Sequence, residues 1–355
     1  MRNSPPTLAL PLKVRGNETR HRSFSPSPLE GEGWGGGYLA KLCLSLCLGT
    51  ALLASSAHAA DKVRAGKAVA TSLPMAMLDL GVHEGIFAKY NIEPEIIAFT
   101  GDARLQQAFA ADSVDIGLGS GPAMAFQVKG APSLAVAAYA GPPRTISVAV
   151  IPDSPIRKAS DLKGKTLAIS TTGSLTEWLA RRLAVKEGWG PEGVKTIALG
   201  AGAAMNGPLF TKQVDAMMTG TENALLLVEK KQVRIVTGME DYAPDFITHV
   251  VFASNSMIEK KPEIIGRFLQ GFFASMQFAK ANKAKTIAFL APLFNEPADV
   301  TEQIYDHEMP MMIDDGHFDP KAIAVLKDSF LDMGILDKKP EDAQLFDARF
   351  VPVKP

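Results

Sequence analysis

The chain has 355 residues, of which 46% are hydrophobic and 21% charged, and its formal net charge is −1. This balance is not typical of a protein that binds nucleic acid or an anionic membrane surface. Two cysteines are too few for a disulfide scaffold. The length is enough for two domains with cores of their own, and one large domain is not excluded by it.

The amino end has the features of an exported protein. Lys41 precedes an apolar run at 42–53 and Ala57-His58-Ala59 follows it, which gives the three regions of a secretory signal peptide over 39–59. We expect cleavage after Ala59, a periplasmic location and a mature chain without cysteine. Residues 1–38 are rich in Pro, Gly, Ser and Arg, so we expect an unstructured lead or a start site assigned too early. Removing residues 1–59 leaves 31 basic and 35 acidic side chains, a formal charge of −4.

Apolar runs of strand length alternate with helical periodicities in the mature chain as far as residue 254. This alternation predicts an α/β fold with parallel, doubly wound sheets. Strands are predicted at 63–70, 92–99, 113–117, 134–139, 146–151, 165–169, 195–199, 216–218, 233–236 and 249–253. Helices are predicted at 75–84, 103–111, 123–128, 175–187, 205–212 and 222–230. After Lys260 the pattern is helical, with a core stripe formed by Ile264, Ile265, Phe268, Leu269, Phe272, Phe273 and Met276.

The unit of strand, turn and helix occurs both before and after Gly141-Pro142-Pro143, which predicts two doubly wound lobes. We assign 60–141 with 255–355 to lobe 1 and 142–254 to lobe 2, with crossings near 141–145 and 243–255. Ligands of such sheets lie outside the carboxyl ends of the strands. Turns from both lobes should therefore face one ligand cleft.

The most informative turn, Ser170 to Ser174, joins a buried strand to an amphipathic helix. The first N–H groups of a helix lack partners and carry a partial positive charge, so Thr171, Thr172, Gly173 and Ser174 are suited to bind an anion. Ordinary capping is the alternative, with Ser174 as N-cap and Glu177 three residues later. We favour the anion site and expect capping to operate beside it.

The segments DLGVHEGIFAKYNIEPEII, GDARLQQAFAADSVDIGLGS and IRKASDLKGKTLAIS resemble those of the periplasmic solute-binding proteins of ABC importers for nitrate, sulfonate, taurine and thiamine precursors. The resemblance covers the whole mature chain. It implies a type II periplasmic binding protein fold, which closes on a small anion or zwitterion without a cofactor or metal. It also implies a monomer that delivers its solute to an ABC permease and ATPase of the inner membrane. The family's pocket positions fall on Ser72, Leu73, Pro74, Ser120, Gly121, Thr172, Gly173, Ser174, Thr221, Glu222 and Asn223, and Thr171 lies beside them.

The later turn departs from the family pattern, because Thr219 to Asn223 stand where members often carry Trp and Pro. Glu222 has two interpretations: it receives the ammonium group of a zwitterion, or it complements the dipole of its own helix. The dipole interpretation is the more common one. Arg144 is either a ligand for an acid or a solvated charge beside the first crossing.

Enzyme motifs are not matched. Met205 breaks the dinucleotide fingerprint of 200–205, and Gly119 stands where a nucleophile elbow needs Ser. His307, Glu308, Asp314, Asp315 and His317 have no metal-site spacing. The strongest enzyme alternative is an enzyme of the same fold in pyrimidine, thiamine or menaquinone precursor biosynthesis. Such enzymes are cytoplasmic, so the signal peptide favours a binding protein without enzymatic activity.

Overall fold

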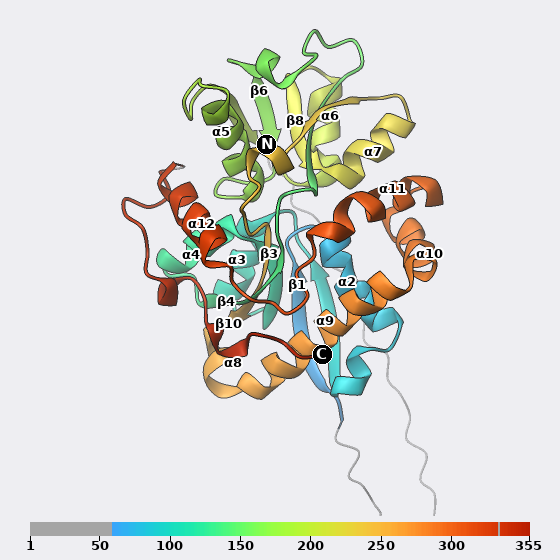
Figure 1. Ribbon diagram of the computed structural model, residues 1–355, viewed down its shortest axis with the longest axis vertical. Coiled ribbons are helices and arrows are strands. Elements are labelled where there is room, and N and C mark those ends of the chain that lie inside the picture. Colours follow the sequence, from blue (N-terminus) through green and yellow to red (C-terminus); the bar gives the residue numbers. More distant parts are fainter. Residues whose placement is uncertain (1–58, 333) are drawn as a thin grey trace, which may run out of the picture. The chain divides into compact units, whose positions relative to one another are not determined.

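Two mixed sheets of five strands each form the frame of the computed structural model (Figure 1). The structure describes residues 59–332 and 334–355. The first sheet has the order β2-β1-β3-β10-β4, with β1 at Asp61–Lys67, β2 at Ile92–Ala98, β3 at Ile116–Ser120, β4 at Ser133–Ala140 and β10 at His249–Ser254. The second has the order β7-β6-β8-β5-β9, with β5 at Ile146–Val150, β6 at Thr166–Ile169, β7 at Lys195–Ala198, β8 at Ala216–Gly220 and β9 at Arg234–Gly238.

Each sheet contains one strand that runs against the others. β1 pairs in parallel with β2 and β3, and β6 with β7 and β8, but β10 and β5 are antiparallel to both of their neighbours. The prediction of parallel sheets was therefore wrong for these two strands. The reason is topological: β5 and β10 are the strands that the chain enters on passing from one sheet to the other. Each starts at the inter-lobe end of its sheet, where the other strands finish.

The chain passes between the sheets at 141–145 and at 239–248. The predicted lobe 2, 142–254, included the strand that is β10, and this part of the assignment is corrected because β10 pairs with β3 and β4 of the first sheet. Hydrophobic alternation identifies a strand but does not reveal its sheet. We call the first sheet with its helices the first lobe, and the second sheet with its helices the second lobe.

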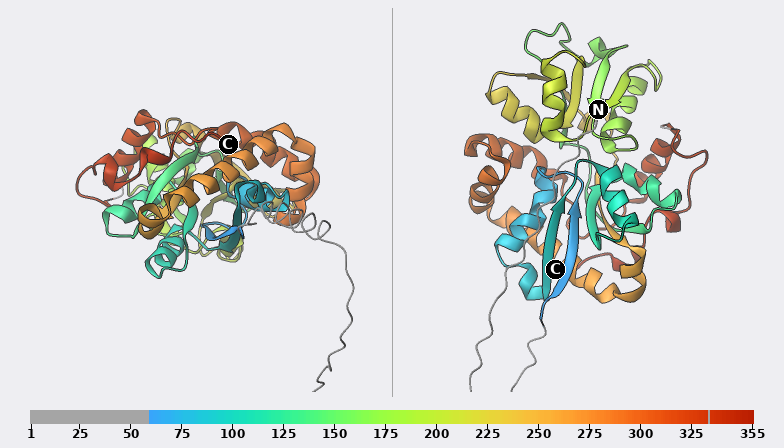
Figure 2. Two further views of the ribbon diagram at one scale, coloured as in Figure 1. Left: turned by 90° about the horizontal axis from the view of Figure 1, so that it is seen from below. Right: turned by 180° about the vertical axis from the view of Figure 1, so that it is seen from behind.

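The helices pack on the two sheets in both views of Figure 2. In the first lobe α9 (Pro262–Ala281) carries the predicted stripe, whose seven side chains are all buried, and packs on α2 (Leu73–His83). α11 (Ala298–Glu308) of the same lobe lies against α7 (Thr221–Glu229) of the second lobe. The α-helices are α2 (Leu73–His83), α3 (Asp102–Ala110), α4 (Ala125–Val128), α5 (Leu175–Lys186), α6 (Asn206–Phe210), α7 (Thr221–Glu229), α8 (Asn255–Lys260), α9 (Pro262–Ala281), α10 (Lys283–Phe294), α11 (Ala298–Glu308) and α12 (Pro320–Asp332). The 3-10 helices are η2 (Phe87–Tyr90), η3 (Pro122–Met124), η4 (Ala159–Leu162), η5 (Gly202–Met205), η6 (Glu240–Tyr242), η7 (Met309–Met311), η8 (Asp342–Gln344) and η9 (Ala348–Phe350).

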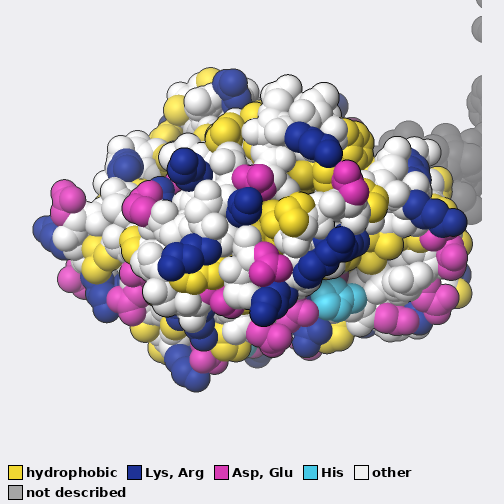
Figure 3. Space-filling model, turned by 90° about the horizontal axis from the view of Figure 1, so that it is seen from above, with side chains coloured by type: hydrophobic (Ala, Val, Ile, Leu, Met, Phe, Trp, Pro, Cys, Tyr) yellow, Lys and Arg dark blue, Asp and Glu magenta, His cyan; other side chains and the backbone are white. Residues whose placement is uncertain are grey.

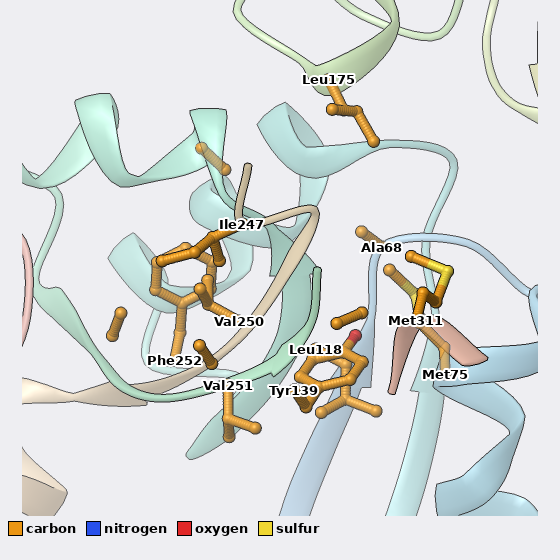
Figure 4. Close-up of a cluster of buried hydrophobic side chains, with 14 of the residues drawn as sticks. Ala68, Met75, Leu118, Tyr139, Leu175, Ile247, Val250, Val251, Phe252 and Met311 are labelled. Carbon is orange, nitrogen blue, oxygen red and sulfur yellow. The ribbon is translucent and has the colours of Figure 1, made fainter. Parts of the chain in front are cut away.

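Apolar side chains bring the two lobes together. Figure 4 shows Leu175, at the start of α5, pointing from the second lobe toward Ala68 and Met75 of the first. In the second crossing Phe246 stacks on Trp178 of α5, with ring centroids 3.9 Å apart and an interplanar angle of 13°. The burial of these side chains favours contact between the lobes.

The predicted lead at 1–38 and nearly all of the predicted signal peptide at 39–59 lie outside the described residues. Among the helices that the structure does describe, none is long and apolar enough to cross a membrane.

Candidate functional site

A cavity of about 60 Å³ lies where the two lobes meet. The first lobe contributes the turn after β1, with Thr71 and Ser72, and the end of β3 at Ser120. The second lobe contributes Ser170 after β6 and Thr219 near the end of β8. The carboxyl ends of strands from both sheets thus converge on one space, as expected for an α/β ligand site.

Four of the twelve predicted site residues line this cavity: Ser72, Ser120, Glu222 and Asn223. The other eight do not line it: Leu73, Pro74, Gly121, Thr171, Thr172, Gly173, Ser174 and Thr221. The prediction selected turns from their composition. Which residue of a turn faces the cavity depends on backbone direction, which composition does not determine.

The turn before α5 is organised as a helix cap. The Ser174 hydroxyl accepts a hydrogen bond from the Glu177 N–H at 3.5 Å, so the predicted N-cap is confirmed. The Glu177 carboxylate in turn accepts from the Gly173 N–H at 2.7 Å. This carboxylate is buried and paired with Arg181 at 3.2 Å. An acidic side chain of the protein therefore already occupies part of the expected anion cradle.

Ser170 and Thr176 are the polar residues of this turn that reach the cavity. The Ser170 N–H donates to Thr176 Oγ1 at 2.9 Å, and the hydroxyls of Ser170, Ser174 and Thr176 are bonded to one another. Thr172 is exposed instead. Thr171 packs against Gly101 of the first lobe. A Cβ atom built on Gly101 would lie only 2.6 Å from the Cγ2 atom of Thr171.

Glu222 connects the lobes at the cavity wall. It lies in the first turn of α7 and is 1% exposed, and its Oε1 accepts a hydrogen bond from the Leu73 N–H of α2 at 2.8 Å. Its Oε2 has no hydrogen-bond partner. Burial raises the pKa of Glu222 to about 7, although the Leu73 N–H opposes this shift.

Two further carboxyl groups stand behind Glu222. Glu308, at the end of α11, is fully buried, and both of its oxygens lack a donor. Burial and the neighbouring Glu222 raise the pKa of Glu308 well above its ordinary value. Burial also raises the pKa of Glu296 to about 8. Because such neighbours cannot all be ionised in a buried site, this carboxyl cluster holds protons at neutral pH.

Asp102, at the start of α3, holds the predicted site residue Ser120 in place. Its two carboxylate oxygens accept from the Ser120 N–H at 2.9 Å and from the Ser120 hydroxyl at 2.8 Å. Burial raises the pKa of Asp102, and these two hydrogen bonds oppose the shift. Ser120 thus faces the cavity with its hydroxyl proton directed at Asp102.

His249, the first residue of β10, was not predicted as a site residue. Its ring stacks on Tyr139, with centroids 5.5 Å apart, and neither ring nitrogen has a hydrogen-bond partner. Burial lowers the pKa of His249 to about 3, so the ring is neutral at physiological pH. The only sequence signal was its place at the start of a strand, and that strand was assigned to the other lobe.

Among the described residues, the cavity wall contains acidic side chains and the neutral His249 but no lysine or arginine. Asp102 and Glu222 are among the described residues that line it, and neither a lysine nor an arginine is. Arg144, considered in the sequence as a ligand for an acid, is outside the lining. On the outer face of the second lobe, basic and acidic side chains are interspersed (Figure 3). Within the residues that the structure describes, no group of three His, Cys, Asp or Glu side chains is placed to hold a metal ion.

Other lining residues missed by the sequence analysis are mostly apolar. Met75, Met205 and Met218 come from α2, η5 and β8, and Leu175 from α5. Methionine is common in ordinary cores, so these residues carried no signal of their own. The arrangement can hold a small molecule by hydrogen bonds and apolar contact.

The solved structures that share this architecture include three binding proteins. The alkanesulfonate-binding protein SsuA from Xanthomonas axonopodis pv. citri, bound to MOPS, has a TM-score of 0.67 at 19% identity, covering 82% of this chain and 96% of its own. The periplasmic aliphatic sulphonate binding protein SsuA from Escherichia coli has a TM-score of 0.66 at 20% identity, covering 81% and 92%. The periplasmic nitrate-binding protein NrtA from Synechocystis PCC 6803 has a TM-score of 0.63 at 13% identity, covering 80% and 83%. At these identities the likeness shows the fold, which is that of the periplasmic binding proteins.

No curated protein sequence matches the chain. The sequence model of the family described as NMT1/THI5 like matches residues 76–286, which run from α2 to α10 and make up more than half of the chain. The match includes the strands of both lobes from β2 to β10. The chain is therefore a member of the NMT1/THI5-like family.

Proposed function

We propose that the chain is the periplasmic substrate-binding component of an ABC importer and captures a small solute by closure of its two lobes. The observation that carries this proposal is the cavity, whose wall is built from strand ends of both lobes. The hydrogen bond from Leu73 to Glu222 spans the same boundary. Membership of the family, and the sulfonate- and nitrate-binding proteins among the structural relatives, support this function.

The proposed solute belongs to the small anionic or zwitterionic class, which includes sulfonates, taurine, nitrate and carboxylates. The cavity is lined by apolar side chains and a few polar groups, as small-molecule sites are. Ser72, Ser120, Glu222 and Asn223 are the predicted contacts that this proposal retains, since they line the cavity. The hydroxyls of Ser72 and Thr145 supply hydrogen-bond donors for the acidic end of a solute.

The proposed route to function begins with export through the segment 39–59 and cleavage after Ala59. The loaded protein, a monomer, then presents its solute to a permease in the inner membrane, and the ATPase of the importer drives transport. Opening of the lobes about the two crossings releases the solute.

We propose no catalytic role. The cavity is lined by Ser120, Asp102 and His249, which are residue types of a catalytic triad. However, the Ser120 hydroxyl donates its hydrogen bond directly to Asp102, and neither ring nitrogen of His249 has a hydrogen-bond partner. In a nucleophilic triad the carboxylate orients the histidine, and the histidine bonds the serine. This difference, together with the binding proteins among the relatives, disfavours the biosynthetic enzyme alternative.

The experiment is a thermal-shift screen of the purified protein against taurine, alkanesulfonates, nitrate, aromatic carboxylates and pyrimidines. A binding protein should show a higher melting temperature with its solute, because ligand that binds only the folded state stabilises it. A bound compound that is chemically converted during the assay would contradict the proposal in favour of an enzyme.

A further inference from the structure

The charges of the cavity wall bear on which end of the solute meets the second lobe. Asp102 is already engaged by Ser120, whereas Glu222 uses only one of its oxygens. The free oxygen, Oε2, lies beside Gly220, because a Cβ built at Gly220 would be 2.7 Å from it. Gly220 and Glu222 both line the cavity, so this oxygen belongs to a residue of the cavity wall.

The pair of Glu222 and Glu308 carries a negative charge that no described basic side chain neutralises. The Glu308 and Glu222 carboxyl groups each affect the pKa of the other. With one proton held by the pair, one negative charge remains. Lys230 lowers the pKa of Glu296, but within the described part of the chain no lysine or arginine pairs with Glu222 or Glu308.

A buried charge without a counterion is costly, and the free energy of binding improves when a ligand supplies that counterion. We propose that the solute presents a protonated nitrogen to Glu222, so that the protein takes amine-bearing solutes in preference to simple anions. This inference rests on the proposed function, because it assigns a chemical class to the same cavity. It differs from the sequence interpretation, in which Glu222 only complements a helix dipole.

The rest of the wall suits an organic body attached to that nitrogen. Met75, Met205 and Met218 present flexible apolar side chains, and the neutral His249 adds a ring with one free donor and one free acceptor. An inorganic anion such as nitrate would leave these apolar side chains without contact and would face Glu222 with a like charge. The wall therefore favours an organic solute with a cationic group.

The test compares matched compounds that differ only in the nitrogen. Isothermal titration calorimetry would measure 2-aminoethanesulfonate against ethanesulfonate, 4-aminobutyrate against butyrate, and phenylalanine against 3-phenylpropanoate. We expect the amine-bearing member of at least one pair to bind about tenfold tighter or more than its partner, because hydrogen bonds to charged groups are the strong ones. In Glu222→Gln, which keeps an acceptor for Leu73 but replaces the free oxygen with a donor, this preference should disappear.

Glu229→Gln is the matched control, since Glu229 lies on the same helix but is exposed and outside the cavity wall. It should keep the wild-type preference. If the amine-free compounds bind as tightly as their amine partners, or if Glu222→Gln keeps the preference, the nitrogen assignment is overturned while the proposed function stands. If none of the six compounds and none of the screened solutes binds, the proposed function fails and the nitrogen assignment fails with it.

Discussion

The carboxylate of Glu222 in the second lobe accepts a hydrogen bond from the backbone N–H of Leu73 in the first lobe, at 2.8 Å. Leu73 is the first residue of α2, so the carboxylate lies at the positive end of a helix that belongs to the opposite lobe. The contact exists only while the lobes are together. Glu222 is thus both part of the cavity wall and part of the contact that keeps the cavity closed.

Replacing Glu222 by Ala should open the unliganded protein. The lost bond involves a charged acceptor and contributes about 1.5 to 3 kcal/mol, which shifts an open-to-closed equilibrium by tenfold or more. Small-angle X-ray scattering should show a larger radius of gyration for Glu222→Ala than for wild type. Glu222→Gln should stay compact, because its carbonyl oxygen can accept from Leu73. Equal scattering curves for Glu222→Ala and wild type would show that the bond does not hold the lobes together.

The stability of the protein should fall as the pH rises from about 4.5 to about 7. Burial raises the pKa of Glu222 in the folded protein from 4.5 to about 7, so the folded state binds more protons than the unfolded state in this window. The contribution of Glu222 to stability is therefore fully present below the pKa of the unfolded state. It is lost as the pH rises through the pKa of the folded state. The shift corresponds to a loss in the free energy of unfolding on the order of 3 kcal/mol, to which the neighbouring Glu308 also contributes.

Urea unfolding at several pH values would measure this loss as a decrease in the free energy of unfolding. Glu308→Gln provides the comparison, since its amide is neutral at every pH and removes the second carboxyl group whose pKa is raised in the folded protein. The decline should be clearly smaller in this variant. A pH profile identical to that of wild type would mean that the carboxyl cluster does not set the pH dependence.

Much of the fold follows from local sequence patterns. The alternation of strand and helix patterns located all ten strands of the two sheets, although the predicted 113–117 lies at Ile116–Ser120. The direction of β5 and β10 could not be predicted from the sequence, because it depends on the end at which the chain enters each sheet. The same limit placed His249 in the wrong lobe and hid it from the predicted site.

The site was predicted at the level of turns but not of single residues. Hydroxyl and glycine turns do meet at the cavity, and Ser72, Ser120, Glu222 and Asn223 line it. Composition could not show that the Glu177 carboxylate would accept a hydrogen bond from the Gly173 N–H, which was predicted to bind an anion. It also could not show that Met75, Met205 and Met218, ordinary core residues in a sequence, would face one space.

Ser174→Ala should lower the stability of the protein and should have little effect on solute binding. The Ser174 hydroxyl caps α5 and bonds Ser170 and Thr176, and the side chain is 1% exposed and lies outside the cavity wall. Loss of such a cap costs about 1 kcal/mol, which chemical denaturation would detect. Thr172→Ala, at an exposed position of the same turn, should leave stability unchanged. A stable Ser174→Ala variant with strongly weakened solute binding would instead restore the anion cradle.

Gly121→Ala should destabilise the protein through the second crossing. Gly121 was predicted as a ligand contact, but its N–H donates to the Thr248 carbonyl at 2.9 Å, and a Cβ there would overlap the carbonyl oxygen of Ile247. A clash with backbone is not relieved by a side-chain rotation, so overpacking of this kind costs about 1 to 3 kcal/mol. Gly266→Ala on α9 is the matched control, because a Cβ at Gly266 meets nothing within 4 Å and alanine favours the helix. Urea unfolding should therefore show a lower midpoint for Gly121→Ala and an equal or higher one for Gly266→Ala. An unchanged midpoint for Gly121→Ala would mean that the crossing moves aside without cost, and that this glycine is not needed for the close approach of the two backbones.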